Sequence, residues 1–331
     1  MKSMKKIISA IIAASMMLTS MTSLAVMAEE TTTTPSVWAV EKASEDTFRV
    51  GMLTDVHIAP SDSTGVAQYM GLGLEAYEAM GVDGLTLPGD IVASQLSHTA
   101  ETIESDLYVG LYKVLDEYGY EIKVDDETEN DANKKPLVYG MGNHEMASNH
   151  QNATGIWAAK DLFVTANGID GLSTVRTVDG KYTGDYVTEM GGYTFIVSSA
   201  NCGLFDAAYT PSAANGVGVD VESWVKEQII AADAAYGDAN KPIFYVQHIP
   251  VNTHGDIQSS KTNSDEFMEW LKDYPNVIIL SGHTHELLDD PRCISQDEGY
   301  TSIVAGVMAT GNCNPPKFLR KMNEKNEKLL F

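Results

Sequence analysis

In the stretch NVIILSGHTHELLDD, Asn276 to Asp290, an apolar run ends in two histidines, His283 and His285. Val277 to Leu280 is short, β-branched and bounded by polar residues, which predicts a buried strand. Open α/β sheets bind ligands at the carboxyl ends of their strands. The histidine pair therefore suggests a site, although GHTH alone is also compatible with a plain polar loop.

Strand-like and helix-like segments alternate from residue 47 onwards, which is typical of an α/β domain. Hydrophobic patterning predicts strands at 48–54, 84–87, 137–141, 193–198, 243–247, 277–280 and 302–307. Helical periodicity predicts helices at 66–80, 104–118, 221–235 and 265–273. The charged segment 123–135 is predicted as a loop. We find no internal repeat and no second domain boundary.

Aspartate, histidine or asparagine follows five of these strands in succession. The segments are VGMLTDVH with Asp55 and His57, GLTLPGD with Asp90, LVYGMGNHE with Asn143 and His144, IFYVQH with His248, and VIILSGHTH with His283 and His285. Divalent metals prefer such ligands. Since the ends of parallel strands meet at one edge of a sheet, we expect these side chains to converge.

About seven ligands are too many for one tetrahedral metal, so the set indicates two metals that share a carboxylate. One metal is expected to take Asp55, His57 and His285. The other is expected to take Asn143, His248 and His283, with Asp90 between the two ions.

In this order, the motifs resemble those of the calcineurin-like metallophosphoesterase family. That family carries D-x-H, GD, GNH[DE], H and GHxH, each after a strand. The matching residues are Asp55-Val56-His57, Gly89-Asp90, Gly142-Asn143-His144-Glu145, His248 and Gly282-His283-Thr284-His285. The resemblance extends over roughly Thr47 to Met308.

The resemblance implies a four-layer αββα sandwich of two mixed β-sheets flanked by helices. It also implies two divalent ions of Mn, Fe, Zn, Co or Ni, and hydrolysis of phosphomonoesters or phosphodiesters of small molecules by a metal-bridging hydroxide. Asp90 would bridge the ions, and Asn143 and His144 would contact the substrate. His144 would protonate the leaving oxygen. From its place in HIPVNTHG, His254 is a further candidate for substrate contact, with an ordinary loop residue as the alternative.

At several positions the sequence differs from known branches of the family, and these differences narrow the class of phosphoesterase that it resembles. GDIVASQ lacks the arginine of protein serine/threonine phosphatases, and it has Ala93 where purple acid phosphatases place a tyrosine. Met146 and Ala147 follow GNHE, where secreted 5′-nucleotidases usually have Phe-Asp. An enzyme similar to either of the last two remains an alternative. So do hydrolysis of a non-phosphate ester or amide and a non-catalytic exported binding protein that keeps the fold.

The first 28 residues have the features of a signal peptide, with Lys2, Lys5 and Lys6 before an apolar core and Val26-Met27-Ala28 as a cleavage site. We expect a secreted protein without a transmembrane helix after cleavage; a retained N-terminal anchor is the alternative. Residues 29–46 are expected to be a polar spacer, 47–312 the metallophosphoesterase domain, and 313–331 a basic C-terminal segment.

The chain carries a formal net charge of −24, which argues against a broad nucleic-acid-binding surface because nonspecific affinity for phosphates comes from Lys and Arg. The expected partner is a small phosphorylated substrate, and the oligomeric state stays open. Cys202, Cys293 and Cys313 are an odd number of cysteines without CxxC spacing, so the sequence indicates no disulfide framework.

Overall fold

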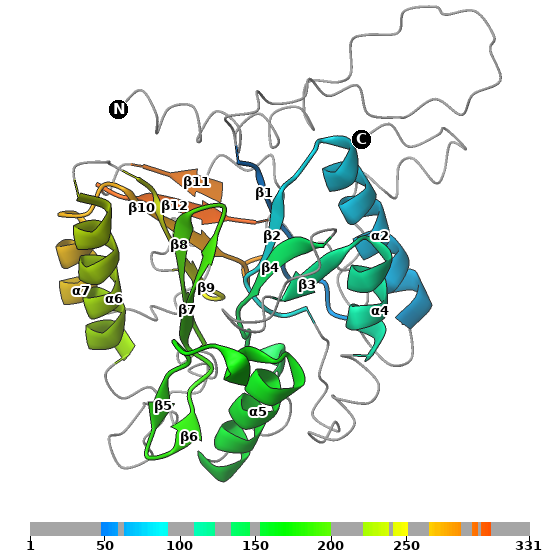
Figure 1. Ribbon diagram of the computed structural model, residues 1–331, viewed down its shortest axis with the longest axis horizontal. Helices are drawn as coiled ribbons and strands as arrows, with labels where there is room; N and C mark the ends of the chain where they lie inside the picture. Colours follow the sequence, from blue (N-terminus) through cyan, green and yellow to red (C-terminus); the bar gives the residue numbers. More distant parts are fainter. Residues whose placement is uncertain are drawn as a thin grey trace, which may run out of the picture.

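The fold consists of two β-sheets with helices on their outer faces (Figure 1). It is seen in a computed structural model that describes residues 48–58, 63–91, 109–122, 134–145, 153–199, 221–237, 241–250, 265–285, 293–296 and 299–305. The predicted α/β architecture of two sheets flanked by helices is confirmed. Within these ranges, no helix combines the length and apolarity needed to cross a membrane. The predicted leader, spacer and C-terminal segment lie outside the described residues.

The first sheet has four strands, and every described pair in it is parallel. Their order is β1 (Val50–Met52), β2 (Gly84–Leu87), β4 (Lys135–Tyr139) and β3 (Tyr120–Ile122). Over the described residues this sheet is thus parallel, and the mixed strand directions lie in the second sheet. β4 also begins at Lys135, inside the segment predicted as a loop.

The second sheet has six strands and is mixed, as expected. The order is β11 (Ile294–Ser295), β12 (Thr301–Val304), β10 (Val277–Ser281), β9 (Ile243–Gln247), β8 (Tyr193–Ser198) and β7 (Tyr186–Met190). The four inner strands run parallel, and the two edge strands are antiparallel to their neighbours.

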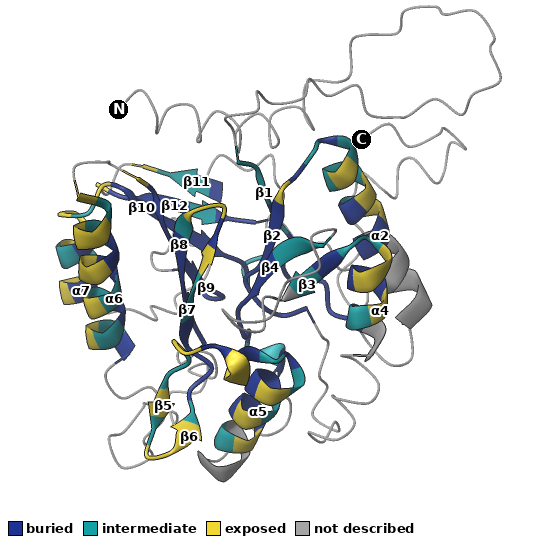
Figure 2. Ribbon diagram, in the orientation of Figure 1, coloured by how far each residue is buried: buried dark blue, intermediate teal, exposed yellow. Residues whose placement is uncertain are grey.

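Alternation along β9 explains the layering. Phe244 and Val246 belong to the hydrophobic cluster that the two sheets share, whereas Ile243 and Tyr245 belong to a second cluster on the opposite face. Successive side chains of a strand point to opposite faces, so a strand buried on both sides is apolar throughout. The second cluster is closed by α6 (Val221–Tyr236) and α7 (Asp265–Leu271), whose inner faces are buried (Figure 2).

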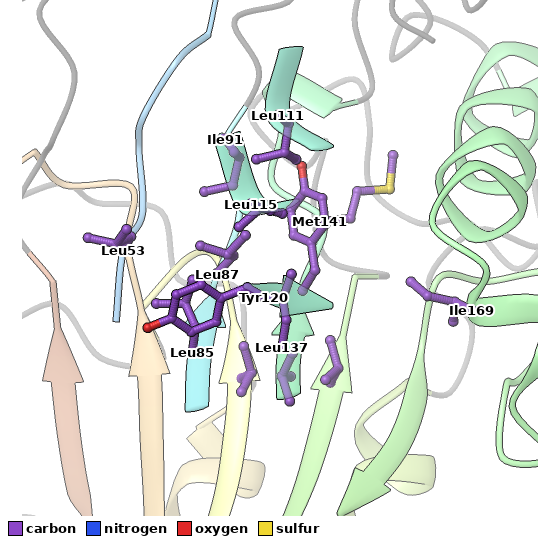
Figure 3. Close-up of a cluster of buried hydrophobic side chains, with 14 of the residues drawn as sticks. Leu53, Leu85, Leu87, Ile91, Leu111, Leu115, Tyr120, Leu137, Met141 and Ile169 are labelled. Carbon is purple, nitrogen blue, oxygen red and sulfur yellow. The ribbon is translucent and has the colours of Figure 1, made fainter. Parts of the chain in front are cut away.

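The first sheet is covered by α2 (Ser63–Ala79) and α4 (Val109–Glu117). Leu111 and Leu115, one turn apart on α4, belong to the same cluster as Leu85, Leu87 and Leu137 of the sheet (Figure 3). A leucine every fourth residue lies on one helix face. These two helices and two sheets complete the four layers with α6 and α7.

Segment 150–185, for which the sequence patterns predicted neither helix nor strand, is regularly folded over most of its length. It contains α5 (Ala153–Ala166), the 3-10 helix η5 (Ile169–Gly171), and the hairpin of β5 (Thr177–Val178) and β6 (Lys181–Tyr182). One reason that α5 was not predicted is Lys160, which interrupts the apolar face of this helix yet is buried. Its Nζ donates to the carbonyl oxygens of Thr183 (2.7 Å) and Ser199 (3.2 Å). The pattern of apolar residues along the sequence does not indicate such a tertiary contact.

Candidate metal centre

The strand-end residues lie close together, as the parallel topology requires. They follow β1, β2 and β4 in the first sheet and β9 and β10 in the second. The main chain joins these ends directly: the amide of Asp55 donates to Gly89 O (3.1 Å), and that of Gly282 donates to His248 O (2.8 Å).

A first group of donors consists of Asp55, His57 and His285. Asp55 Oδ1 lies 3.1 Å from His285 Nε2 and 4.0 Å from His57 Nε2. The two imidazole Nε2 atoms are 3.2 Å apart. Three ligand atoms this close together have the composition and spacing of a divalent metal site.

A second group consists of Asp90, His248 and His283. His248 Nε2 lies 3.0 Å from Asp90 Oδ2 and 3.2 Å from His283 Nδ1. Asp55 Oδ1 is also 4.0 Å from His248 Nε2, so the two groups adjoin. The grouping of histidines matches the predicted division between two metals, and the role of each residue as a ligand stays a prediction.

Asn143 and His144 lie beside the second group. Asn143 Oδ1 is buried without a hydrogen-bond partner among the described residues, which fits an oxygen ligand. The backbone amide of His144 donates to Asp90 Oδ1 (2.7 Å), and its Nε2 lies 3.8 Å from Asp90 Oδ2. The His144 side chain is 38% exposed, so it is accessible to a substrate.

His144 also belongs to a third group of possible ligands, with His57 and Asp90, that the sequence did not suggest. Its ring meets that of His57 edge-on, with centroids 4.4 Å apart. His254, the other predicted substrate contact, lies outside the described residues, as do Cys202 and Cys313. Cys293 is buried.

The backbone is strained where the candidate ligands lie. Outside glycine, φ is positive at six described residues, and five of them are Asp55, His57, Asp90, His283 and His285. Such conformations are disfavoured for residues with a side chain and persist only where the surroundings impose them. Strain of this kind gathers at functional sites.

Two glycines permit the close approach of these loops. A Cβ at Gly142 would overlap the carboxylate of Asp90, and one at Gly282 would overlap Thr54 and the carboxylate of Asp55. The glycines of GNHE and GHTH are therefore required by sterics and not by a turn.

The pKa values of the candidate ligands are shifted in different directions. Burial lowers the pKa of His57 to about 4, and burial likewise lowers that of His283 to about 4. Burial also disfavours a charged His248, but the Asp90 carboxylate outweighs it and raises the pKa of His248 to about 9. Burial opposes ionisation of Asp90 too, yet His248 holds the pKa of that carboxyl well below its usual range. At neutral pH and without metal, a charged His248 is thus paired with Asp90, while His57 and His283 are neutral.

Comparison with known proteins agrees with this geometry. The sequence pattern described as calcineurin-like phosphoesterase matches residues 48–287, more than half of the chain. The chain belongs to the calcineurin-like phosphoesterase family. Family membership supports metal-dependent hydrolysis of phosphoesters, as the motif order predicted.

Solved structures related to this phosphoesterase are distant. A dimetal phosphatase from Danio rerio is 13% identical, with a TM-score of 0.46, and covers 79% of this chain and 88% of its own. GAP50, the anchor in the inner membrane complex of Plasmodium, is 15% identical, with a TM-score of 0.43; the match covers 78% of this chain and 71% of GAP50. No curated protein matches the chain.

The donors of this family member fit two divalent cations. Six side chains in two adjoining groups supply carboxylate and imidazole, and the buried Asn143 oxygen adds a further donor. Carboxylate and imidazole together suit Mn, Fe, Zn, Co and Ni.

Glu145, the last residue of the GNHE motif, has a position that its sequence context did not predict. The structure buries its carboxylate beneath the centre, where it accepts hydrogen bonds from the amides of Asp90 and Gly142. The only sequence signal was a glutamate directly after a ligand motif.

Proposed function

We propose that this chain is an exported phosphoesterase that hydrolyses small phosphomonoesters or phosphodiesters with two bound divalent ions. One observation carries the proposal: two adjoining donor groups, linked through Asp55 and Asp90, lie beside the accessible imidazole of His144. When bound, the ions would supply neutralisation of phosphoryl charge and activation of water. Export rests on the predicted leader alone.

The residues divide the work as follows. Asp55, His57 and His285 would hold one ion, and Asn143, His248 and His283 the other, with Asp90 between them. The amide of His144 is tied to Asp90 Oδ1, which fixes the imidazole relative to the shared carboxylate. Histidine commonly transfers protons near neutral pH, so His144 would protonate the leaving oxygen. His254 would contact the substrate.

The negative charge of the chain does not oppose a phosphate substrate, because bound cations dominate the field inside such a site. It does oppose a broad nucleic-acid-binding surface, since nonspecific binding to the phosphate backbone needs Lys and Arg. The substrate is therefore proposed to be a small phosphorylated compound.

The test compares p-nitrophenyl phosphate with bis-p-nitrophenyl phosphate, using the exported form of the protein. Each is assayed after chelation and again after addition of Mn²⁺, Zn²⁺ or Fe²⁺, with bound metal counted. We expect turnover to return with about two metals per chain, as two-metal catalysis requires. The faster substrate will distinguish a monoesterase from a diesterase.

Asp90→Asn is the matched variant, because it keeps the shape of the side chain and removes the shared charge. We expect it to lose metal pairing and activity together. Full activity in Asp90→Asn would disprove the bridging role, and metal binding without turnover on either substrate would favour a binding protein.

A further inference from the structure

The Glu145 carboxylate accepts four hydrogen bonds while being only 1% exposed. Its Oε2 accepts from the backbone amides of Asp90 (2.9 Å) and Gly142 (2.6 Å). Its Oε1 accepts from the amide of Ile91 (2.8 Å) and from the hydroxyl of Tyr139 (2.9 Å). All four donors are neutral, so the carboxylate receives charge-assisted hydrogen bonds, which are stronger than neutral ones.

The three amide donors come from the two loops that carry Asp90 and Asn143. One loop follows β2, the other follows β4, and each sends a carboxylate to the backbone of the other. Asp90 Oδ1 accepts from the amide of His144, while Glu145 accepts from the amides of Asp90 and Ile91. The exchange fixes the two loops relative to each other at both ends.

This pair of hydrogen-bonded loops is anchored in the core of the molecule through Tyr139. Tyr139, which donates to Glu145, is fully buried at the end of β4. Its backbone amide and carbonyl both bond to the hydroxyl of Tyr186, which belongs to β7 of the second sheet. Glu145 therefore ties the strand-end loops of one sheet to a contact between the two sheets.

We propose that Glu145 is a positioning residue that sets the distance between Asp90 and Asn143, and thereby the spacing of the two metal ions. The inference rests on the proposed function, since it presumes a metal pair. Glu145 itself would touch neither metal nor substrate, because both of its oxygens face backbone amides and Tyr139.

Glu145→Gln is the sharpest variant because it keeps size and shape. The glutamine NH2 group would replace one of the two acceptor oxygens and would face two hydrogen-bond donors. It cannot accept from them, so buried polar groups lose their hydrogen bonds. Tyr139→Phe removes one donor and leaves the carboxylate in place. Glu227→Gln, exposed on α6, is the matched control for loss of a glutamate charge.

The experiment loads the full-length protein and each variant with Mn²⁺ and measures binding isotherms and electron paramagnetic resonance spectra. A closely spaced Mn²⁺ pair gives an exchange-coupled spectrum that separate ions lack. We expect Glu145→Gln to bind the second Mn²⁺ about 10- to 100-fold more weakly, the range typical for partners of metal ligands. Its coupled signal should fall accordingly, and kcat should fall more than KM changes.

For Tyr139→Phe we expect a smaller loss, roughly threefold in affinity for the second ion, as one neutral hydrogen bond implies. Glu227→Gln should match the unsubstituted protein. Urea unfolding of each variant separates a positional effect from lost stability. If Glu145→Gln does not fold, Tyr139→Phe still decides.

A coupled spectrum and second-site affinity equal to those of the unsubstituted protein, in both Glu145→Gln and Tyr139→Phe, would overturn the positioning role. Lower stability with an unchanged spectrum would do the same. If the unsubstituted protein shows a coupled pair but hydrolyses neither p-nitrophenyl ester, the proposed function fails while the role of Glu145 is still judged by the spectra. If it binds no pair at all, both fail.

Discussion

At the scale of single residues, the centre depends on glycines as much as on the candidate metal ligands, because some positions have no room for a side chain. Gly282 lies between the GHTH histidines and the side chains of Thr54 and Asp55, where no Cβ fits. We expect Gly282→Ala to displace Asp55 and to weaken metal binding by more than about tenfold, as displaced ligand shells do. Metal binding isotherms measure this directly.

Gly180→Ala is the control, because a Cβ at Gly180 meets nothing within 4 Å although its φ is +74°. Alanine in that left-handed conformation should cost about 1–2 kcal/mol of stability and leave metal affinity unchanged. Normal metal binding in Gly282→Ala would show that the backbone shifts to accommodate the added Cβ without displacing Asp55.

His144 is expected to act on the leaving group, since its imidazole is accessible and its backbone is tied to Asp90. His144→Ala should retain both metals. It should lose about 10²- to 10⁴-fold in kcat on alkyl phosphates, whose leaving groups need a proton, and far less on p-nitrophenyl phosphate. An equal loss on both substrates would contradict proton donation.

Metal binding should release a proton from His248. Its pKa is raised to about 9, so this histidine is protonated at pH 7.5 in the metal-free protein, and a ligand must be neutral. His57 and His283, with pKa values lowered to about 4, are already neutral there. Affinity should therefore rise with pH until the pH passes about 9.

Calorimetry in buffers of different ionisation enthalpy counts the protons released. Asp90→Asn removes the charge that raises the pKa of His248, so that variant should release fewer protons per bound metal ion at pH 7.5. The same count in both proteins would refute the pairing of His248 with Asp90.

At the scale of elements, the two sheets are linked by a tyrosine. The Tyr186 hydroxyl donates to Tyr139 O (2.7 Å) and accepts from Tyr139 N (3.0 Å), at the end of β4 beyond its pairing with β3. Tyr186→Phe would remove both of these buried hydrogen bonds, at a cost of about 0.5–1.5 kcal/mol each. Urea unfolding should show this loss.

Tyr182→Phe, on the hairpin of β5 and β6, is the matched control and should be nearly neutral. A stability for Tyr186→Phe equal to that of the control would mean that the sheets do not depend on this contact.

At the scale of the whole molecule, the strand ends of both sheets meet at one centre, so metal binding should stabilise the entire fold. At a metal concentration 100-fold above Kd, each site adds about 2.7 kcal/mol to the free energy of unfolding. We expect Tm to fall on chelation and to recover with Mn²⁺. Asp90→Asn should respond less, and a Tm independent of metal would argue against cation binding.

Much of the fold was predictable where local chemistry agrees with tertiary context. β2, β8 and β9 match the predicted ranges, and β10 extends only one residue further, because buried strands are apolar on both faces. α5 was not predicted because Lys160 interrupts its apolar face, and the two-residue strands β5, β6 and β11 are too short to show an alternating pattern.

The sequence by itself determined which strands are followed by Asp, His or Asn, and it thereby predicted the candidate ligands, because parallel strands bring their carboxyl ends to one edge of a sheet. Only the tertiary structure decided how they are held together. The exchange of carboxylates between Asp90 and Glu145, the overlap that excludes a side chain at Gly142 and Gly282, and the shift of the His248 pKa all arise between segments far apart in the chain. Distances between such segments follow from the packing of the whole fold, which no local pattern encodes.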